Sequence, residues 1–269
     1  MSPKIHRVSG SLMAVNSYLV EGAKGVVVVD GMLTLSDARA VRRALDDIGK
    51  PALAGIVTHA HPDHYAGFAE IFRGLDVPIY ATPAVRGVIE RDDAVKNGIV
   101  GPMMGEEWPK TRVFPSHEVQ TGSELRLFDL RFEVHDVGPA ESPADAIWKL
   151  DERTLFVGDL VYSGMHAYLA DGYATEWLSC LEALDRTMAW DATLYPGHGT
   201  PGGAPLITAQ QRYVQAFVAA VERHLTQPAA ERRAAVVAEM KDLLGTEDLK
   251  FLMELSVDPF AAKLEGAQK

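Results

Sequence analysis

One short stretch, Thr58-His59-Ala60-His61-Pro62-Asp63-His64, constrains the fold of this chain more than any other. Three histidines and an aspartate fall within six residues, directly after the apolar run 54–57, which is typical of a buried strand. Pro62 fixes its own φ and lacks an N–H, so the histidines belong to a turn rather than to the interior of a sheet. Neutral imidazoles and carboxylates are the ligands that zinc, iron and manganese take in proteins. We therefore predict a metal site at the end of a strand.

Strands and helices alternate along the chain before residue 200. Apolar and β-branched runs predict strands at 12–20, 25–30, 54–57, 77–81, 124–128, 130–137, 146–150, 154–157 and 193–195. Apolar residues at helical spacing predict helices at 36–48, 65–73 and 176–188, with Ser36 or Asp37 capping the first and Thr175 the last. The alternation favours an α/β sandwich.

Two segments depart from this rhythm. Residues 84–116 show little regular pattern, so we expect a loop that either packs locally or covers the metal site as a flap, with Met103, Met104 and Trp108 lining a substrate pocket. Residues 206–269 predict three helices, at 206–225, 228–243 and 246–264. These helices could cover the pocket or mediate homodimerisation, and the sequence does not choose between the two.

Composition and charge narrow the classes of partner. The 269 residues are 47% hydrophobic and carry a net charge of −11, which argues against a nucleic-acid-binding or anionic-membrane-binding surface. The one cysteine, Cys180, excludes an intramolecular disulfide, and its helical spacing to Trp177 and Leu181 predicts a core position. The N-terminus lacks the apolar core of a signal peptide, and no run of 18 apolar residues occurs. We expect a cytoplasmic protein that acts on a small molecule.

Four segments together resemble the motifs of the metallo-β-lactamase superfamily. They are the His-x-His-x-Asp-His turn, Gly138-Pro139-Ala140-Glu141-Ser142-Pro143-Ala144-Asp145, Leu155-Phe156-Val157-Gly158-Asp159 and Tyr195-Pro196-Gly197-His198-Gly199. The resemblance covers most of residues 5–205. It implies an αββα sandwich in residues 1–205, in which two similar βα halves enclose one site, and it leaves residues 206–269 as a helical C-terminal extension.

The resemblance also implies two divalent metal ions, zinc first. His59, His61 and residue 141 would hold one ion, Asp63, His64 and His198 the other, and Asp159 would bridge them. A metal-bridging hydroxide would then attack an ester, lactone, thioester or amide carbonyl, and Asp63 would orient it and pass its proton onward. Asp30 would support the site from beneath or serve only as a turn former.

Glu141 departs from the family pattern, because a histidine is expected there. Three accounts are open. In the first, Glu141 is itself a ligand, which adds a negative charge and favours harder ions such as iron or manganese. In the second, Glu141 does not reach the metal, the first site is weak, and one metal binds tightly. In the third, His135 substitutes for Glu141. We favour direct ligation by Glu141, since a carboxylate is itself a metal ligand.

The sequence favours a metal-dependent hydrolase of a small ester, lactone or related compound. The alternatives are a glyoxalase II-like thioesterase, an iron persulfide dioxygenase, and a metal-dependent ligand-binding protein without turnover. Among the other histidines, His166 lies either in the pocket with Tyr162 and Tyr168 beside it or in a capped loop. His6, His117 and His224 are expected at the surface or in packing.

Overall fold

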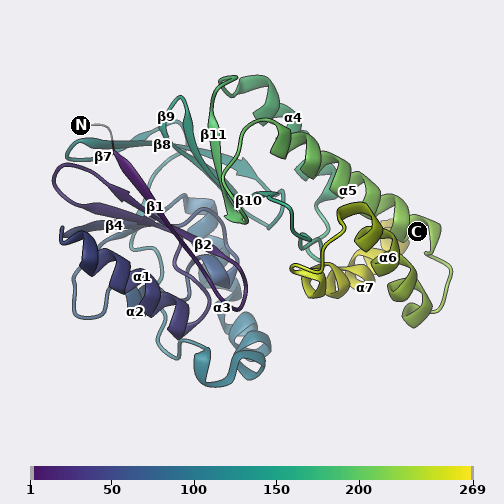
Figure 1. The fold of residues 1–269 in the computed structure, drawn as a ribbon. Coiled ribbons are helices and arrows are strands. Elements are labelled where there is room, and N and C mark those ends of the chain that lie inside the picture. The colour runs from purple at the N-terminus through teal and green to yellow at the C-terminus, as the bar shows by residue number, and fades with distance from the viewer. Residues whose placement is uncertain (1–2, 268–269) are drawn as a thin grey trace.

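Two β-sheets pack face to face at the centre of the molecule, in a computed structural model that describes residues 3–267 (Figure 1). The first sheet has the order β1 (Lys4–Ser9), β2 (Asn16–Glu21), β3 (Val26–Val29), β4 (Ala52–Ile56), β5 (Ile79–Ala81) and β6 (His117–Glu118). The second has the order β11 (Thr193–His198), β10 (Thr154–Tyr162), β9 (Asp145–Asp151), β8 (Leu130–Gly138) and β7 (Glu124–Leu127).

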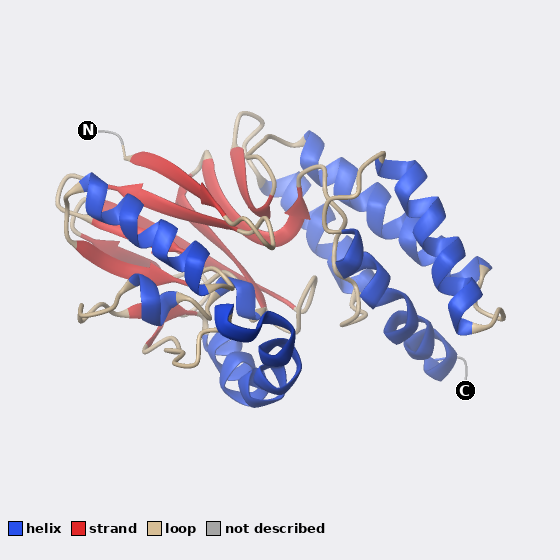
Figure 2. Cartoon of the chain, turned by 60° about the horizontal axis from the view of Figure 1, so that its bottom comes forward, coloured by secondary structure: helices blue, strands red, loops and turns tan. Residues whose placement is uncertain are grey.

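Helices cover the outer face of each sheet, as Figure 2 shows from a second direction. Those on the side of the first sheet are α1 (Leu35–Ile48), α2 (Phe68–Ile71) and α3 (Pro83–Met104). On the side of the second lie α4 (Ala174–Thr187) and α5 (Pro205–Arg223), and α6 (Ala229–Leu244) and α7 (Lys250–Ala267) pack on α5 and extend beyond the sheets. The predicted αββα sandwich with C-terminal helices is therefore confirmed. Among residues 3–267, no helix is long and apolar enough to cross a membrane.

The core between the sheets explains the apolar strands. The run Val26–Val29 is fully buried, as a strand covered on both faces should be. Across the interface the rings of Tyr18 and Phe156 lie 5.6 Å apart, centre to centre. The indole N–H of Trp148 donates to the carbonyl of Val57 at 3.2 Å and so ties the second sheet to the end of β4.

Strand direction places the chemistry at one edge. β4 runs parallel to β3, and β10 runs parallel to β11. The turn 58–64 leaves the carboxyl end of β4, while Asp159 and His198 lie near the carboxyl ends of β10 and β11. An isolated bridge between His59 and Asp145 joins the two sheets at this edge. The topology therefore collects residues far apart in sequence.

The expectation of an irregular loop over residues 84–116 is wrong for most of its length, because α3 is a helix of 22 residues. The Thr82 hydroxyl accepts a hydrogen bond from the Val85 N–H at 3.3 Å, and Pro83 follows in the first turn, where its fixed φ suits a helix. Val85, Ile89 and Asp93 recur every four residues and are buried. This packing outweighs the three glycines inside the helix, each of which costs about 1 kcal/mol relative to alanine.

Several smaller expectations need correction. Thr34 caps α1 in place of Ser36 or Asp37, and α4 begins at Ala174 with no side-chain cap, so Thr175 is inside it. The helix expected at 65–73 is only a 3₁₀ turn at Pro62–His64 followed by the four residues of α2. β1 was not predicted from the sequence. Its residues do not alternate between buried and exposed positions, so no period of two marks it as a strand.

Candidate metal centre

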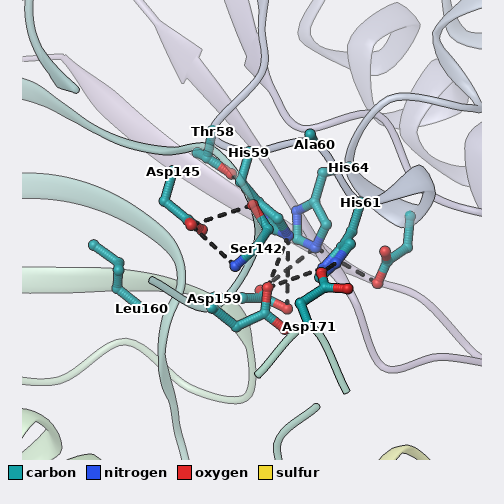
Figure 3. Close-up of polar contacts among 12 residues, drawn as sticks. Thr58, His59, Ala60, His61, His64, Ser142, Asp145, Asp159, Leu160 and Asp171 are labelled. Atoms are coloured by element: carbon teal, nitrogen blue, oxygen red, sulfur yellow. Dashed lines mark hydrogen bonds and ion pairs between the residues drawn. The ribbon is translucent and has the colours of Figure 1, made fainter. Parts of the chain in front are cut away.

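Seven side chains converge where the two sheets meet, and they are the seven that the sequence predicted. Their candidate ligand atoms form two groups, each with all atoms within 4.8 Å of one another. The first group is His59, His61 and Glu141, and the second is Asp63, His64, Asp159 and His198. Figure 3 shows the histidines of the turn and Asp159 pointing toward one another.

Asp159 sits between the two groups. In the second group, its Oδ1 lies 3.4 Å from His64 Nε2 and its Oδ2 lies 3.3 Å from His198 Nε2. The same Oδ2 is 4.0 Å from His59 Nε2 in the first group. Glu141 Oε2 completes that first group, 2.9 Å from His61 Nδ1 and 3.7 Å from His59 Nε2. A carboxylate in this position can contact both groups at once.

The buried polar atoms fit a metal centre. The imidazole Nε2 atoms of His59, His64 and His198, together with Glu141 Oε2 and Asp159 Oδ1, are buried without a hydrogen-bond partner among the described residues. Such atoms are costly in a folded protein unless something else satisfies them. Three imidazole nitrogens and two carboxylate oxygens aimed into one space are the donor set that divalent metals bind.

Two glycines allow this close approach. Gly158 has φ +52°, and a Cβ there would lie 2.6 Å from Thr58 Oγ1 and 3.1 Å from His59 Nδ1. A Cβ at Gly197 would overlap Asp159 Oδ1 and lie 2.7 Å from His64 Cε1. Glycine at these positions therefore lets Asp159 and the histidines come together.

Asp30 supports the second group from beneath, which resolves the two interpretations of its sequence context. Its Oδ1 accepts from the Thr58 N–H at 2.9 Å, and its Oδ2 accepts from the Thr58 hydroxyl at 2.8 Å. The same Oδ2 lies 2.9 Å from His64 Nδ1. Asp30 thus directs the opposite nitrogen of His64 into the site. It adopts a left-handed conformation, φ +64°, which aspartate tolerates.

A loop held by Asp145 presents Glu141. Asp145 Oδ2 accepts from the backbone N–H groups of Ala140 at 3.2 Å and Ser142 at 3.0 Å, and Figure 3 shows the Asp145 carboxylate directed toward Ser142. These two N–H groups flank Glu141, so its side chain turns inward and is 2% exposed. The motif 138–145 predicts this loop, but nothing in the sequence indicates how Asp145 shapes it.

Two further residues contact the first group, and the sequence predicts neither contact. The Tyr162 hydroxyl lies 2.6 Å from Asp159 Oδ2 and 3.0 Å from Glu141 Oε1. The Asp171 carboxylate accepts from His61 Nε2 at 2.9 Å, which leaves His61 Nδ1 directed at Glu141. Asp171 precedes a glycine and so resembles an ordinary turn former; the sequence contains no signal that would have marked it.

The mutual arrangement of carboxylates and imidazoles sets the electrostatics. Burial alone would lower the pKa of His61, but Glu141 beside it raises that pKa to about 10. Burial opposes the charged form of His198, but the Asp159 carboxylate favours that form and raises the pKa of His198 to about 9. Burial raises the pKa of Glu141 to about 7. For Asp63, burial raises the pKa, but His64 and His198 together outweigh burial and hold the pKa well below its usual range. The carboxylates and imidazoles of the site therefore shift one another's pKa values.

Other candidate residues lie elsewhere. His135 Nε2 is 2.8 Å from Glu133 Oε1, so the account in which His135 replaces the missing ligand finds no support. His166 is buried against Tyr213 and the carbonyl of Thr246, 3.0 Å and 3.1 Å from its two nitrogens, and it is a packing residue. Cys180 is half-buried with its thiol directed at the carbonyl of Val137.

A cavity of about 390 Å³ opens onto the centre. Its walls include His61, Asp63, Glu141, Asp159 and Tyr162. Met103 and Met104 also line the cavity as expected, whereas Trp108 does not. Instead Trp108 is buried and donates to the Asn97 side chain at 2.7 Å. The pocket role expected for Trp108 is therefore wrong.

The fold and the site define a class, a two-sheet sandwich with a His/Asp cluster at the strand ends. The chain belongs to the metallo-beta-lactamase superfamily, whose family model matches residues 10–198. A metallo-beta-lactamase family protein from Thermus thermophilus superimposes with a TM-score of 0.70 over 99% of this chain and 94% of its own, at 22% identity. A beta-lactamase domain protein from Burkholderia ambifaria gives 0.69 over 100% and 88%, at 18% identity. These two likenesses concern the fold.

The curated sequence relatives are matched over only part of their length. The alpha subunit of a 2,4-dinitroanisole O-demethylase from Nocardioides sp. is 28% identical over 66% of this chain and 51% of its own. The Bacillus subtilis protein described as "probable metallo-hydrolase YybB" is 31% identical over 54% of this chain and 61% of its own. The chain thus matches only about half to three-fifths of these curated relatives.

Proposed function

We propose that this protein is a metal-dependent hydrolase that binds two divalent ions and acts on a small ester, lactone or related carbonyl compound. The observation that carries the proposal is the set of five buried ligand atoms that make no hydrogen bond among the described residues and lie beside a cavity. Membership of a superfamily whose enzymes are generally hydrolytic supports it, as does the relative described as a metallo-hydrolase.

Each ligand group would hold one ion. His59, His61 and Glu141 would hold the first, Asp63, His64 and His198 the second, and Asp159 would bridge them. When bound, such ions supply Lewis acidity, which polarises the bond under attack and lowers the pKa of water to near neutral. Four imidazoles favour zinc, while Glu141 adds an oxygen ligand and a negative charge that make iron or manganese acceptable.

The chain's own residues would orient the reaction. Asp63 lines the cavity, and its pKa lies well below the usual range, because His64 and His198 together outweigh the effect of burial. Its carboxylate is therefore available to accept a proton from the attacking water. Tyr162 also lines the cavity and holds Asp159 and Glu141 together through its hydroxyl. Both roles place polar groups at the inner end of the cavity, where the reacting bond would lie.

Metal content tests the proposal directly. We expect about two metal ions per chain by mass spectrometry in protein purified without added metal, falling toward one in Glu141→Ala, because the first group loses an oxygen ligand. Glu133→Ala removes a half-exposed glutamate outside the cluster and should keep both ions. Hydrolysis of an ester and lactone panel should fall with the lost ion.

Other outcomes select other functions. A single iron per chain, together with oxygen consumption, would move the assignment to dioxygenase chemistry. Metal binding without turnover of any ester, lactone or thioester would leave a ligand-binding protein. Wild-type protein that takes up no metal when supplied with zinc, iron or manganese would refute the proposal.

A further inference from the structure

We propose that the cleft between α3 and α7 binds the apolar part of an uncharged substrate, so that the C-terminal helices form one wall of the active site. This inference rests on the hydrolase proposal for the reacting end of the substrate. It names the class of compound: a neutral ester or related molecule with an alkyl or aryl group of several carbons.

The first wall is a stripe along α3. Val95, Ile99 and Met103 are spaced by four residues, so they lie on one face of the helix. They are 63%, 60% and 60% exposed, respectively, and all three line the cavity. A helix normally turns such a face to the core. Three exposed apolar side chains at the mouth of a cavity therefore call for something apolar to cover them.

The second wall comes from α7, more than 140 residues later in the chain. Phe251 and Leu255, also spaced by four, are 39% and 52% exposed and line the same cavity, with Leu252 between them. Figure 2 shows α3 and the C-terminal helices as separate groups on either side of the sheets' end. The cavity thus joins the sandwich to the extension that follows it.

The cleft is continuous with the metal centre. Asp63, Glu141 and Asp159 line the inner end of the same cavity of about 390 Å³. Small-molecule sites fall at about 300–1,000 Å³ and are mostly apolar with a few polar groups at one end. A small molecule could therefore place its reacting bond at the centre and its apolar group between the helices.

Charge disfavours an anionic group at the apolar end of the cleft. Lys96 is the one lysine or arginine among the described residues that line the cavity. Its ammonium donates to the carbonyl of Ala60 at 2.7 Å, and Asp92 and Asp171 line the cavity beside it. An anionic group held between α3 and α7, away from the two proposed metal ions, would meet these carboxylates with Lys96 as the one lysine or arginine in the described cavity wall, and burying an incompletely paired charge is costly.

Two ester series test the class of substrate. One extends the acid, from methyl acetate to methyl octanoate, and the other extends the alcohol, from methyl acetate to octyl acetate, both followed by proton release. We expect kcat/KM in at least one series to rise about fourfold per added methylene until the cleft is filled. The half-ester of octanedioic acid, with a charged end, should lose this gain. A flat response in both series would overturn the inference.

A matched pair of variants localises the effect. Leu255→Glu places a charge in the cleft at a position that is already half-exposed. It should lower at least tenfold the ratio of kcat/KM for the longest ester to kcat/KM for the shortest ester in the series that responds, called here the octyl-to-methyl ratio. Leu243→Glu makes the same change on α6, at a leucine that is 38% exposed and outside the cavity, and should leave the ratio unchanged. Equal ratios in the two variants would contradict a cleft between α3 and α7.

A binding measurement separates this inference from the hydrolase proposal. The neutral fluorescent probe N-phenyl-1-naphthylamine should bind with a stoichiometry of one, be displaced by octan-1-ol, and bind at least tenfold more weakly to Leu255→Glu than to Leu243→Glu. That result would support the cleft even if no ester were hydrolysed, in which case the hydrolase proposal alone would fail. Ester hydrolysis without chain-length dependence or probe binding would support the hydrolase proposal and overturn the cleft.

A dimer interface is the other use that this face could have. If the protein is a dimer that Leu255→Glu dissociates, and the octyl-to-methyl ratio is unchanged, the face is an interface between two copies and the inference is overturned.

Discussion

The two ligand groups differ in how the chain holds them. The second group, with Asp63, His64 and His198, keeps the family pattern, is buried, and is braced from beneath by Asp30. The first group contains Glu141 where the pattern has histidine, and among the described residues no such brace lies beneath it; each group reaches the cavity through one side chain that is 12% exposed, His61 in the first and Asp63 in the second.

The partners of the first group suit its altered ligand. One oxygen of Glu141 faces His61 and the other meets the Tyr162 hydroxyl, while Asp171 fixes His61 from its far side. When ionised, a carboxylate has two oxygens that accept hydrogen bonds, and the Tyr162 hydroxyl donates to the one that does not face His61. The comparison suggests that the first site is the adaptable one and the second the constant one. Three substitutions test that difference.

Asp159→Asn should have the largest effect, because Asp159 is the residue that contacts both groups. An amide oxygen is a weaker ligand than a carboxylate, so we expect both ions to be lost and hydrolysis to fall by more than the roughly 10–100-fold typical of a supporting residue. Metal content by mass spectrometry measures this, with Asp151→Asn on the exposed end of β9 as the control. Retention of two ions would show that the groups are independent.

Much of this centre was predictable, because the residues that form it are marked by short motifs. His59, His61, Asp63 and His64 lie in one turn, and Asp159 and His198 each end a β-rich run. Glu141 could be placed only through its loop, because nothing in a lone glutamate marks it as a ligand. The structure brings all seven together, and their role as ligands stays a prediction.

What the sequence could not supply depends on contacts between distant segments. Asp171 is 110 residues from His61, and Tyr162 is 21 residues from Glu141; no local pattern links either pair. The helix α3 was hidden by its glycines, because propensity argued against it while packing of Val85 and Ile89 outweighed propensity. Its exposed stripe then became one wall of the cavity, which a loop could not have provided.

Asp30→Asn should affect the second group alone, with an intermediate loss. The amide can still accept from Thr58 but presents no second carboxylate oxygen to His64, so metal affinity at the second site should fall about 10–100-fold. Because Asp30 is buried, the lost charge-assisted hydrogen bonds should also cost about 1.5–3 kcal/mol of stability, seen as a Tm lower by several degrees. Asp37→Asn, at another buried aspartate that pairs with Ser11, should lower Tm without changing metal affinity.

Asp171→Ala should have the smallest effect on metal affinity, and that effect should be limited to the first group. Its side chain is 28% exposed, so water can replace the lost acceptor of the His61 N–H and the free energy of unfolding should hardly change. His61 then loses its fixed orientation, and we expect affinity for the first ion to fall about tenfold, the low end for a supporting carboxylate. Titration of metal-free protein with zinc measures the two sites separately. Asp92→Ala removes a carboxylate that lines the same cavity but pairs with Arg91, and it should leave both affinities unchanged. Equal weakening of the two sites by Asp171→Ala would mean that the groups are coupled and that the first is not separately adaptable.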